Sequence, residues 1–171
     1  MKTLAFNPYL PEWEHIPDGE PRVFGDRVYI YGSHDEDGGE EFCLLDYVCW
    51  SAPVDDLGNW RYEGIIYRKE QEPLQRDASI PGIPDRVAAG LPHLLFAPDV
   101  VQGKDGRYYL YYSMDFSNVI SVAAADRPEG PFAFLSHVKR ADGTLPPDIR
   151  WFDPAVLCDA CGVYLYMGSA P

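Results

Sequence analysis

Short runs of alternating apolar and polar residues, separated by glycine and proline, extend along the chain. A half-buried strand hides every second side chain, so this period of two predicts β-strands. The clearest strand pairs end in the aromatic runs at residues 28–32, 108–113 and 163–169, each preceded by a turn and a shorter apolar segment. No window shows a convincing helical period. The pattern therefore predicts an all-β protein.

The strand pairs recur as copies of one pattern. Each copy opens on a proline beside an acid, at Glu20–Phe24, Ala97–Val101 and Asp153–Leu157. Further apolar segments predict two more strands in each of the first two copies, over residues 42–51 and 59–65 and over residues 119–124 and 132–135. Repeated four-strand units are typical of β-propeller blades. A sandwich of the same strands would leave the repetition unexplained.

The segment from Glu70 to Pro92 interrupts this repetition. It contains Pro73, Pro81, Pro84 and Pro92, and it predicts an irregular excursion over one face of the protein. Such excursions often shape binding sites.

Composition narrows the range of partners. The chain has 171 residues, 46% of them hydrophobic, and a formal charge of -13. An acidic chain without clustered Lys and Arg is a poor ligand for nucleic acid or an anionic membrane, so we expect neither as a partner. No apolar run approaches a membrane span, and residues 1–8 break off too soon for a signal-peptide core. We therefore expect a cytoplasmic protein.

The positions of the four cysteines favour structural roles over a metal or redox site. Cys158 and Cys161 have a spacing found in zinc and redox sites, but they fall in the turn between two predicted strands, where the other copies carry Gly and Asp. A structural turn is the preferred interpretation. Cys43 and Cys49 have no metal-like spacing and are expected to be free, buried thiols. No metal and no cofactor are predicted.

The ordered set of motifs resembles glycoside hydrolase family 43. The resemblance rests on Asn7–Leu10, Ile16–Asp35, Ala97–Val100, Tyr108–Ser113 and Phe152–Val156. It implies a five-bladed β-propeller that acts on xylosides and arabinosides with inversion. Residues 1–171 would then form the N-terminal part of the catalytic domain, with blades one and two and the start of blade three, a partial propeller of about two and a half blades.

The resemblance also implies roles for acids in an axial pocket. Asp153, directly before a proline, would tune the pKa of the general acid and orient it. The general base would be an acid of blade one. Aligned without gaps on the proline, that acid is Glu20, but Asp18 is the residue type that the family uses. Both remain candidates, and Asp18 can also be a simple turn residue in Pro-Asp-Gly.

Four more residues are candidates for binding substrate. His34 and Asp35 follow the first aromatic strand at a blade end and could line the pocket, although a satisfied loop histidine is as good an interpretation of His34. Trp13 and Phe152 offer flat faces for a sugar, yet aromatics between blades usually belong to the core. For Asp99 we expect a structural carboxylate at a blade start in preference to a substrate contact.

The family's general acid, a glutamate, would be expected beyond Pro171. Inverting hydrolysis needs two carboxyl groups roughly 6.5 to 9.5 Å apart. The chain would therefore show little turnover by itself, unless a second chain supplied the remaining blades. Two hypotheses follow: a hydrolase acting on pentose-containing oligosaccharides or polysaccharides, or a non-catalytic half-propeller for carbohydrate binding or assembly. Related five-bladed fructofuranosidases and phosphorylases are disfavoured, because their entry motif and a basic phosphate cluster are missing.

Overall fold

The described residues form three antiparallel sheets. In the computed structural model these are residues 7–75, 77, 86, 88–115, 119–145 and 150–170. Blade one contains β1 (Glu20–Phe24), β2 (Arg27–Tyr31), β3 (Tyr47–Pro53) and β4 (Arg61–Tyr67); blade two contains β5 (Asp99–Gln102), β6 (Tyr108–Ser113), β7 (Ile120–Ala125) and β8 (Ala133–His137); blade three contains β9 (Arg150–Cys158) and β10 (Val163–Ala170). The strand order follows the sequence in both four-stranded sheets. The prediction of an all-β chain with two four-strand units is confirmed.

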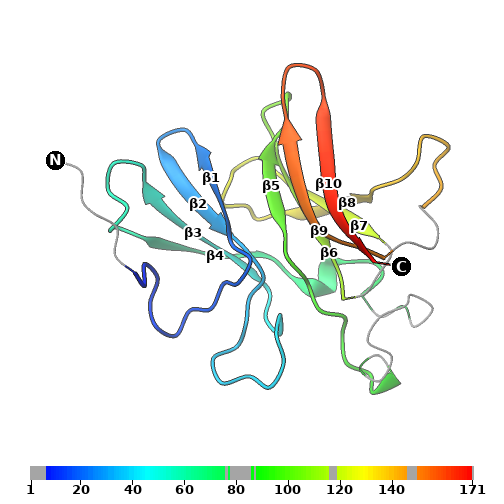
Figure 1. Cartoon of the computed structure of the whole chain (residues 1–171), viewed down its shortest axis with the longest axis horizontal. Helices are drawn as coiled ribbons and strands as arrows, with labels where there is room; N and C mark the ends of the chain where they lie inside the picture. The colour runs from blue at the N-terminus through cyan, green and yellow to red at the C-terminus, as the bar shows by residue number, and fades with distance from the viewer. Residues whose placement is uncertain are drawn as a thin grey trace.

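The three blades are arranged side by side around their first strands. β5 lies between β1 and β9, and the hairpin turns of all three blades point to the same end of the molecule (Figure 1). The segments that enter blades one and two, and the long loop between β2 and β3, lie at the opposite end. This arrangement agrees with consecutive blades of a propeller, and it gathers the residues before β1 and β5 at one end.

The turns form where glycine and aspartate predict them. Gly25 and Gly106 have φ angles of 63° and 83°, a left-handed backbone that residues with a Cβ rarely adopt. In blade three the Asp159 carboxylate accepts hydrogen bonds from the backbone N–H groups of Cys161 and Gly162, at 2.7 and 3.0 Å. Cys158 and Cys161 thus flank a structural turn, and both are free thiols.

Aromatic side chains fill the space between blades one and two. The buried cluster includes Tyr29, Tyr31, Tyr47, Tyr67 and Tyr112. Buried tyrosine hydroxyls need partners, and these reach from blade to blade: Tyr31 donates to the Pro128 carbonyl at 2.7 Å, and the hydroxyls of Tyr67 and Tyr112 lie 2.6 Å apart. The tyrosine-rich strands therefore join the blades.

Asp99 links all three blades. Its carboxylate is fully buried and accepts two hydrogen bonds from the Arg22 guanidinium of β1, one of them 2.8 Å long. It also accepts from the backbone N–H of Val156 in β9, at 2.7 Å. A buried carboxylate needs such partners. The expectation that Asp99 is structural agrees with this geometry.

One predicted strand starts in the wrong place. Residues 42–46 were expected to open the third strand, but β3 begins only at Tyr47. Cys43 has a left-handed backbone with φ 58°, and the Asp46 carboxylate accepts from the Lys69 backbone N–H at 3.0 Å. Contacts to the segment after β4 thus replace strand pairing here.

The segment between the first two blades is irregular in its described part. It opens with the short 3-10 helix η1 (Lys69–Gln71), and its prolines Pro81 and Pro84 lie outside the described residues. Among the described residues, no helix has the length and apolar character needed to span a membrane.

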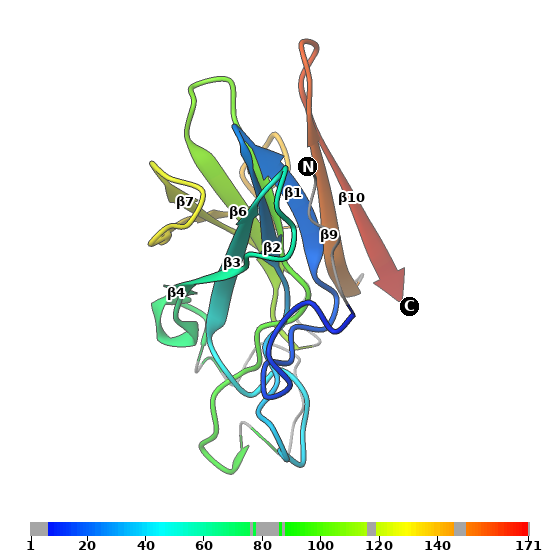
Figure 2. The ribbon, with the colours of Figure 1, turned by 90° about the vertical axis from the view of Figure 1, so that its left-hand side faces the viewer.

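The hairpin of β9 and β10 lies at the edge of the molecule, with β10 outermost (Figure 2). Leu157, Val163, Tyr164 and Tyr166 of this hairpin are exposed. The outer edge of β10 has no neighbouring strand among the described residues, and such an edge beside exposed apolar side chains is a surface that further strands can cover.

Candidate active site

Asp18 lies in the turn that leads into β1. Its φ of 57° is left-handed, and the Ser33 hydroxyl donates to Oδ2 at 3.1 Å. The turn passes so close to the end of β2 that a Cβ on Gly32 would lie 2.6 Å from the Pro17 carbonyl oxygen and 2.9 Å from Gly19 Cα. Glycine at position 32 therefore lets the turn hold Asp18 against the blade end.

Asp153 lies at a β-bulge. The register of β9 and β10 shifts between Tyr166 and Gly168, and Asp153 has a φ of 49°. Bulges re-aim the side chains beside them, and Pro154 has no N–H to lose from the ladder. At the bulge the Asp153 side chain no longer follows the regular alternation of side chains between the two faces of the strand.

The strand pairing can be used to compare the positions of the blade-one acids with the position of Asp153 in blade three. Each aromatic strand carries a Tyr-aliphatic-Tyr motif whose last tyrosine, Tyr31, Tyr111 or Tyr166, pairs with Glu20, Asp99 or Ala155 respectively. Asp18 lies two residues before Glu20, and Asp153 two residues before Ala155. Counted from this tyrosine, Asp18 matches Asp153. Counted from the Gly-Ser pairs beyond the β-bulge, Gly32-Ser33 and Gly168-Ser169, Glu20 matches Asp153, so the equivalence of Glu20 and Asp153 stays a prediction.

The charge of Asp18 acts on the Asp153 carboxyl group. Withdrawal from solvent raises the pKa of Asp153, and the negative charge of Asp18 raises this pKa further. Glu20 is not among the causes of that shift. Of the two blade-one candidates, the structure brings Asp18 together with Asp153. A site of this kind can hold one carboxyl group protonated beside a charged one.

Cys43 completes the same neighbourhood. Burial raises the pKa of its thiol to about 12, a hydrogen bond with Ser33 acts in the opposite direction, and the charges of Asp35, Asp18 and Asp153 add to the rise. Among the described residues other than glycine, Asp18, Cys43 and Asp153 have a positive φ. Strained backbone of this kind clusters at functional sites. Its convergence here marks the space around Asp18 as the candidate active site.

Asp35 holds the backbone of Cys43 in place. Its Oδ1 accepts from the Cys43 backbone N–H at 2.6 Å, and its own N–H donates to the His15 carbonyl at 3.0 Å. Asp35 therefore orients the left-handed residue Cys43, and its contact with substrate stays a prediction.

His34 has both ring nitrogens engaged. Nδ1 lies 2.8 Å from the Asp46 carbonyl oxygen and Nε2 lies 2.8 Å from Glu14 Oε1. The buried Glu14 carboxylate also accepts from Trp50 Nε1 at 2.7 Å. These contacts agree with the interpretation of His34 as a satisfied loop histidine, which ties the entry segment to blade one.

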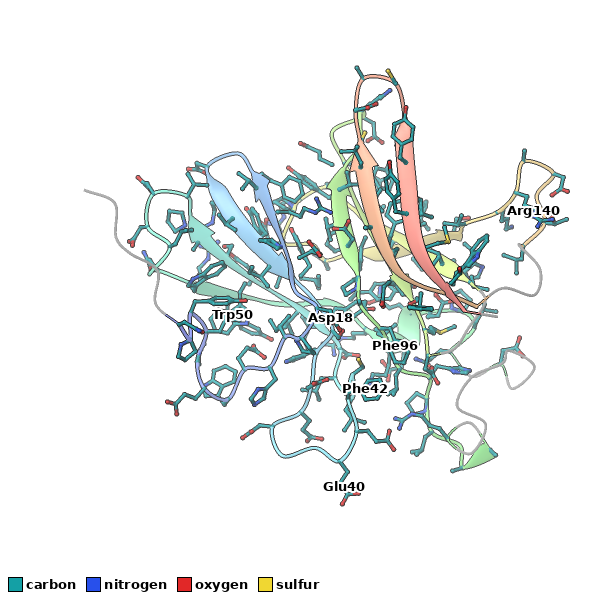
Figure 3. All side chains as sticks on the ribbon, in the orientation of Figure 1. Asp18, Glu40, Phe42, Trp50, Phe96 and Arg140 are labelled. Atoms are coloured by element: carbon teal, nitrogen blue, oxygen red, sulfur yellow. The ribbon has the colours of Figure 1, made fainter. Side chains whose placement is uncertain are left out.

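The two aromatic candidates lie in different settings. Trp13 is exposed and packs against Trp50, with ring centroids 6.2 Å apart, and Trp50 lies at a distance from Asp18 on the outer side of blade one (Figure 3). The Phe152 ring covers Gly168 of β10 so closely that a Cβ there would lie 2.6 Å from it. Phe152 is adjacent to Asp153 in β9, whereas no contact brings Trp13 to the acids.

Cys43 and its neighbour Phe42 were missed as site residues. Their apolar run resembles the start of a strand, and only the contacts of the folded chain place it beside Asp18. No group of three or more His, Cys, Asp or Glu side chains in the described ranges is arranged to hold a metal ion.

Comparison with known proteins places this site in a family. The sequence profile of glycosyl hydrolases family 43 matches residues 15–171. A xylosidase/arabinosidase of Thermoclostridium stercorarium is 53% identical over the whole chain, which covers 34% of that protein. A beta-xylosidase of Xylanibacter ruminicola is 32% identical over 94% of the chain and 47% of its own length. The chain thus spans between a third and a half of the length of these relatives.

Solved structures show the same fold. A family 43 beta-xylosidase/alpha-arabinofuranosidase from a compost metagenome, in complex with xylotriose, is 28% identical and superposes with a TM-score of 0.66 over 96% of this chain and 45% of its own. A family 43 enzyme of Xanthomonas citri, complexed with xylose, is 27% identical and superposes with a TM-score of 0.63 over 92% of this chain and 40% of its own. The sheets described above are blades of a partial β-propeller, and the chain belongs to glycosyl hydrolases family 43.

Proposed function

We propose that the protein takes part in the hydrolysis of O-glycosidic bonds in xylose- or arabinose-containing oligosaccharides and polysaccharides. The observation that carries this proposal is the meeting of Asp18 and Asp153 at the blade ends, where Asp18 acts on the pKa of Asp153. Two relatives with xylosidase names and two neighbours bound to xylose or xylotriose support this substrate class.

In this proposal Asp18 is the general base. The Ser33 hydroxyl holds its Oδ2 and fixes the orientation of the carboxylate, which then takes a proton from the attacking water. Water attacks the anomeric carbon from the face opposite to the leaving oxygen, so the configuration is inverted. Precise placement of the base is needed, because an error of about 1 Å can cost roughly a hundredfold in rate.

Asp153 is the modulator of the general acid. A negative charge beside a second carboxyl group raises the proton affinity of that group and keeps it protonated near neutral pH. The acid that donates its proton to the leaving oxygen is proposed to be a glutamate from a blade beyond β10. Those blades would cover the exposed face of β9 and β10, whether they come from the same polypeptide or from a second chain.

A second candidate function is favoured by the open edge of β10. A half-propeller with an open strand edge and exposed Tyr164 and Tyr166 can serve as a non-catalytic module for carbohydrate binding or assembly. Catalysis separates the two candidates, because only the hydrolase needs the Asp18 carboxylate.

The test uses the protein at its natural length with nitrophenyl xyloside and arabinofuranoside. Asp18→Asn is expected to lower kcat by several orders of magnitude, Asp153→Asn to lower it strongly, and Glu20→Gln to leave it within a few fold. NMR of the first product formed should show the inverted anomer. A wild-type protein that binds xylotriose without hydrolysing any of these substrates would support the binding module. Loss of activity in Glu20→Gln, with Asp18→Asn active, would contradict the assignment of the base.

A further inference from the structure

An aromatic pair lies at the mouth of the candidate active site. Phe42, from the loop between β2 and β3, and Phe96, from the segment before β5, have ring centroids 5.5 Å apart and planes inclined at 39°. Phe42 is 56% exposed, although burying a phenylalanine is normally favourable by about 2 kcal/mol. A large exposed aromatic at a site is a candidate ligand contact.

Residues next to Phe42 and Phe96 connect this aromatic pair with Asp18 and Asp153. Cys43, next to Phe42, turns inward to Ser33 and feels the charges of Asp18 and Asp153. The Tyr47 hydroxyl donates to the Phe96 carbonyl oxygen. Figure 3 shows Phe42 and Phe96 at the same end of the blades as Asp18. The left-handed backbone of Cys43 therefore buries the thiol beside the acids and leaves the preceding phenylalanine at the rim.

The loop that carries Phe42 is held from outside blade one. The buried guanidinium of Arg86 forms an ion pair with Glu41, and the Lys69 ammonium donates to the Leu44 carbonyl oxygen. Arg86 Nε also donates to the Pro92 carbonyl oxygen at 2.8 Å. These contacts flank Phe42 on both sides along the chain, so the ring is presented by a braced loop and keeps little freedom to lose on binding.

We propose that Phe42, backed by Phe96, forms an aromatic wall that stacks on the sugar ring next to the one being cleaved, and that the Glu41–Arg86 ion pair positions this wall. The proposal rests on the proposed function. The cleaved sugar must lie against the carboxylates, and Phe42 lies beyond Cys43 at the rim, where the next ring of the substrate would pass. The C–H face of a neutral pyranose suits a flat aromatic surface, and the formal charge of -13 disfavours an anionic ligand.

The first test measures binding of xylose and xylotriose to the natural-length protein by calorimetry. Phe42→Ala is expected to weaken xylotriose binding about five- to tenfold and to leave xylose binding unchanged, while Phe42→Tyr keeps both affinities. Leu135→Ala, an exposed apolar residue of β8, is the matched control and should change neither. Thermal melts verify that each variant is folded.

The outcomes separate this inference from the function on which it rests. If wild type binds xylotriose and Phe42→Ala binds it equally well, the aromatic wall is wrong and the proposed function stands. If Phe42→Ala weakens xylose and xylotriose equally, Phe42 does not act on the neighbouring ring and the inference is also wrong. A wild-type protein that binds neither sugar would overturn both.

The positioning contact is tested by kinetics on xylotriose. Glu41→Gln is expected to raise KM about two- to fivefold with kcat unchanged, because the site for the neighbouring ring loosens while the acids stay in place. Glu40→Gln removes the same charge from the adjacent exposed residue and should leave KM unchanged. A fall in kcat without a change in KM, or equal effects of the two variants, would contradict a positioning role for Glu41.

Discussion

Asp18 and Asp153 share a left-handed backbone, with φ angles of 57° and 49°, and the negative charge of Asp18 raises the pKa of Asp153. Each lies two residues before the partner of the last tyrosine in the Tyr-aliphatic-Tyr motif. In blade two the same position is Ala97, so the repeat contributes an acid from two of its three copies. By this count the acid pair follows the repeat, adapted by a turn in blade one and a bulge in blade three.

The lack of a side chain at Gly32 is expected to be necessary for the position of Asp18 beside Asp153. A Cβ at this position would lie 2.5 Å from Ile16 Cγ2 and 2.6 Å from the Pro17 carbonyl oxygen, so Gly32→Ala must push the turn that carries Asp18 away from the blade. We expect hydrolysis to fall at least tenfold, with a loss of about 1 to 3 kcal/mol in unfolding free energy.

Gly162→Ala is the matched control, because its nearest neighbour would be 3.9 Å away in the hairpin turn of blade three. Kinetics and urea unfolding of both variants provide the comparison. Equal activity of Gly32→Ala and wild type would show that the turn does not need its close approach to β2.

Asp99 is expected to be the most costly carboxylate to remove. In Asp99→Asn the new side-chain NH₂ group is a hydrogen-bond donor that faces another donor, either the backbone N–H of Val156 or the guanidinium of Arg22. The Arg22 guanidinium also loses the negative charge with which it pairs. We expect the unfolding free energy to fall by about 3 kcal/mol in urea titrations. Asp126→Asn breaks the exposed pair with Arg107 and should change it by less than about 0.5 kcal/mol. Similar small effects of both changes would refute the role of Asp99 as a clamp.

Glu72 is expected to make stability depend on acid pH. Burial alone would raise its pKa, but hydrogen bonds from His137, Tyr112 and the Leu74 backbone N–H outweigh burial and lower it. A carboxyl with a lowered folded pKa binds fewer protons than in the unfolded chain. Its contribution is therefore present above the unfolded value of 4.5 and is lost as pH falls through the folded pKa.

Urea unfolding of wild type and Glu72→Gln between pH 7 and pH 3 tests this contribution. The two proteins should differ most at neutral pH and converge on acidification. A difference that stays constant, or grows as pH falls, would contradict the lowered pKa of Glu72.

The hairpins could be predicted because their signals are local. Alternation of apolar residues defines the strands, and Gly25-Asp26 or Asp159–Gly162 define the turns without help from distant residues. The start of β3 could not be found in this way. Residues 42–46 are apolar enough for a strand, but Lys69 and Arg86 hold this loop in another conformation.

The choice between Asp18 and Glu20 lay beyond the sequence for a different reason. Alignment on the proline matches Glu20 with Asp153, whereas alignment on the tyrosine motif matches Asp18 with Asp153. The two alignments differ by two residues, which is one period of a strand, so the same side chains face the core in both. Only the charges that meet in the folded chain distinguish them.

The central claim is that Asp18, and not Glu20, shares a site with Asp153. The most direct measurement is the pKa of the Asp153 carboxyl, followed by carbon NMR during a pH titration of wild type, Asp18→Asn and Glu20→Gln. We predict that Asp18→Asn lowers this pKa, because a neighbouring negative charge is removed, and that Glu20→Gln leaves it unchanged. An Asp153 pKa that falls in Glu20→Gln and stays constant in Asp18→Asn would contradict the account.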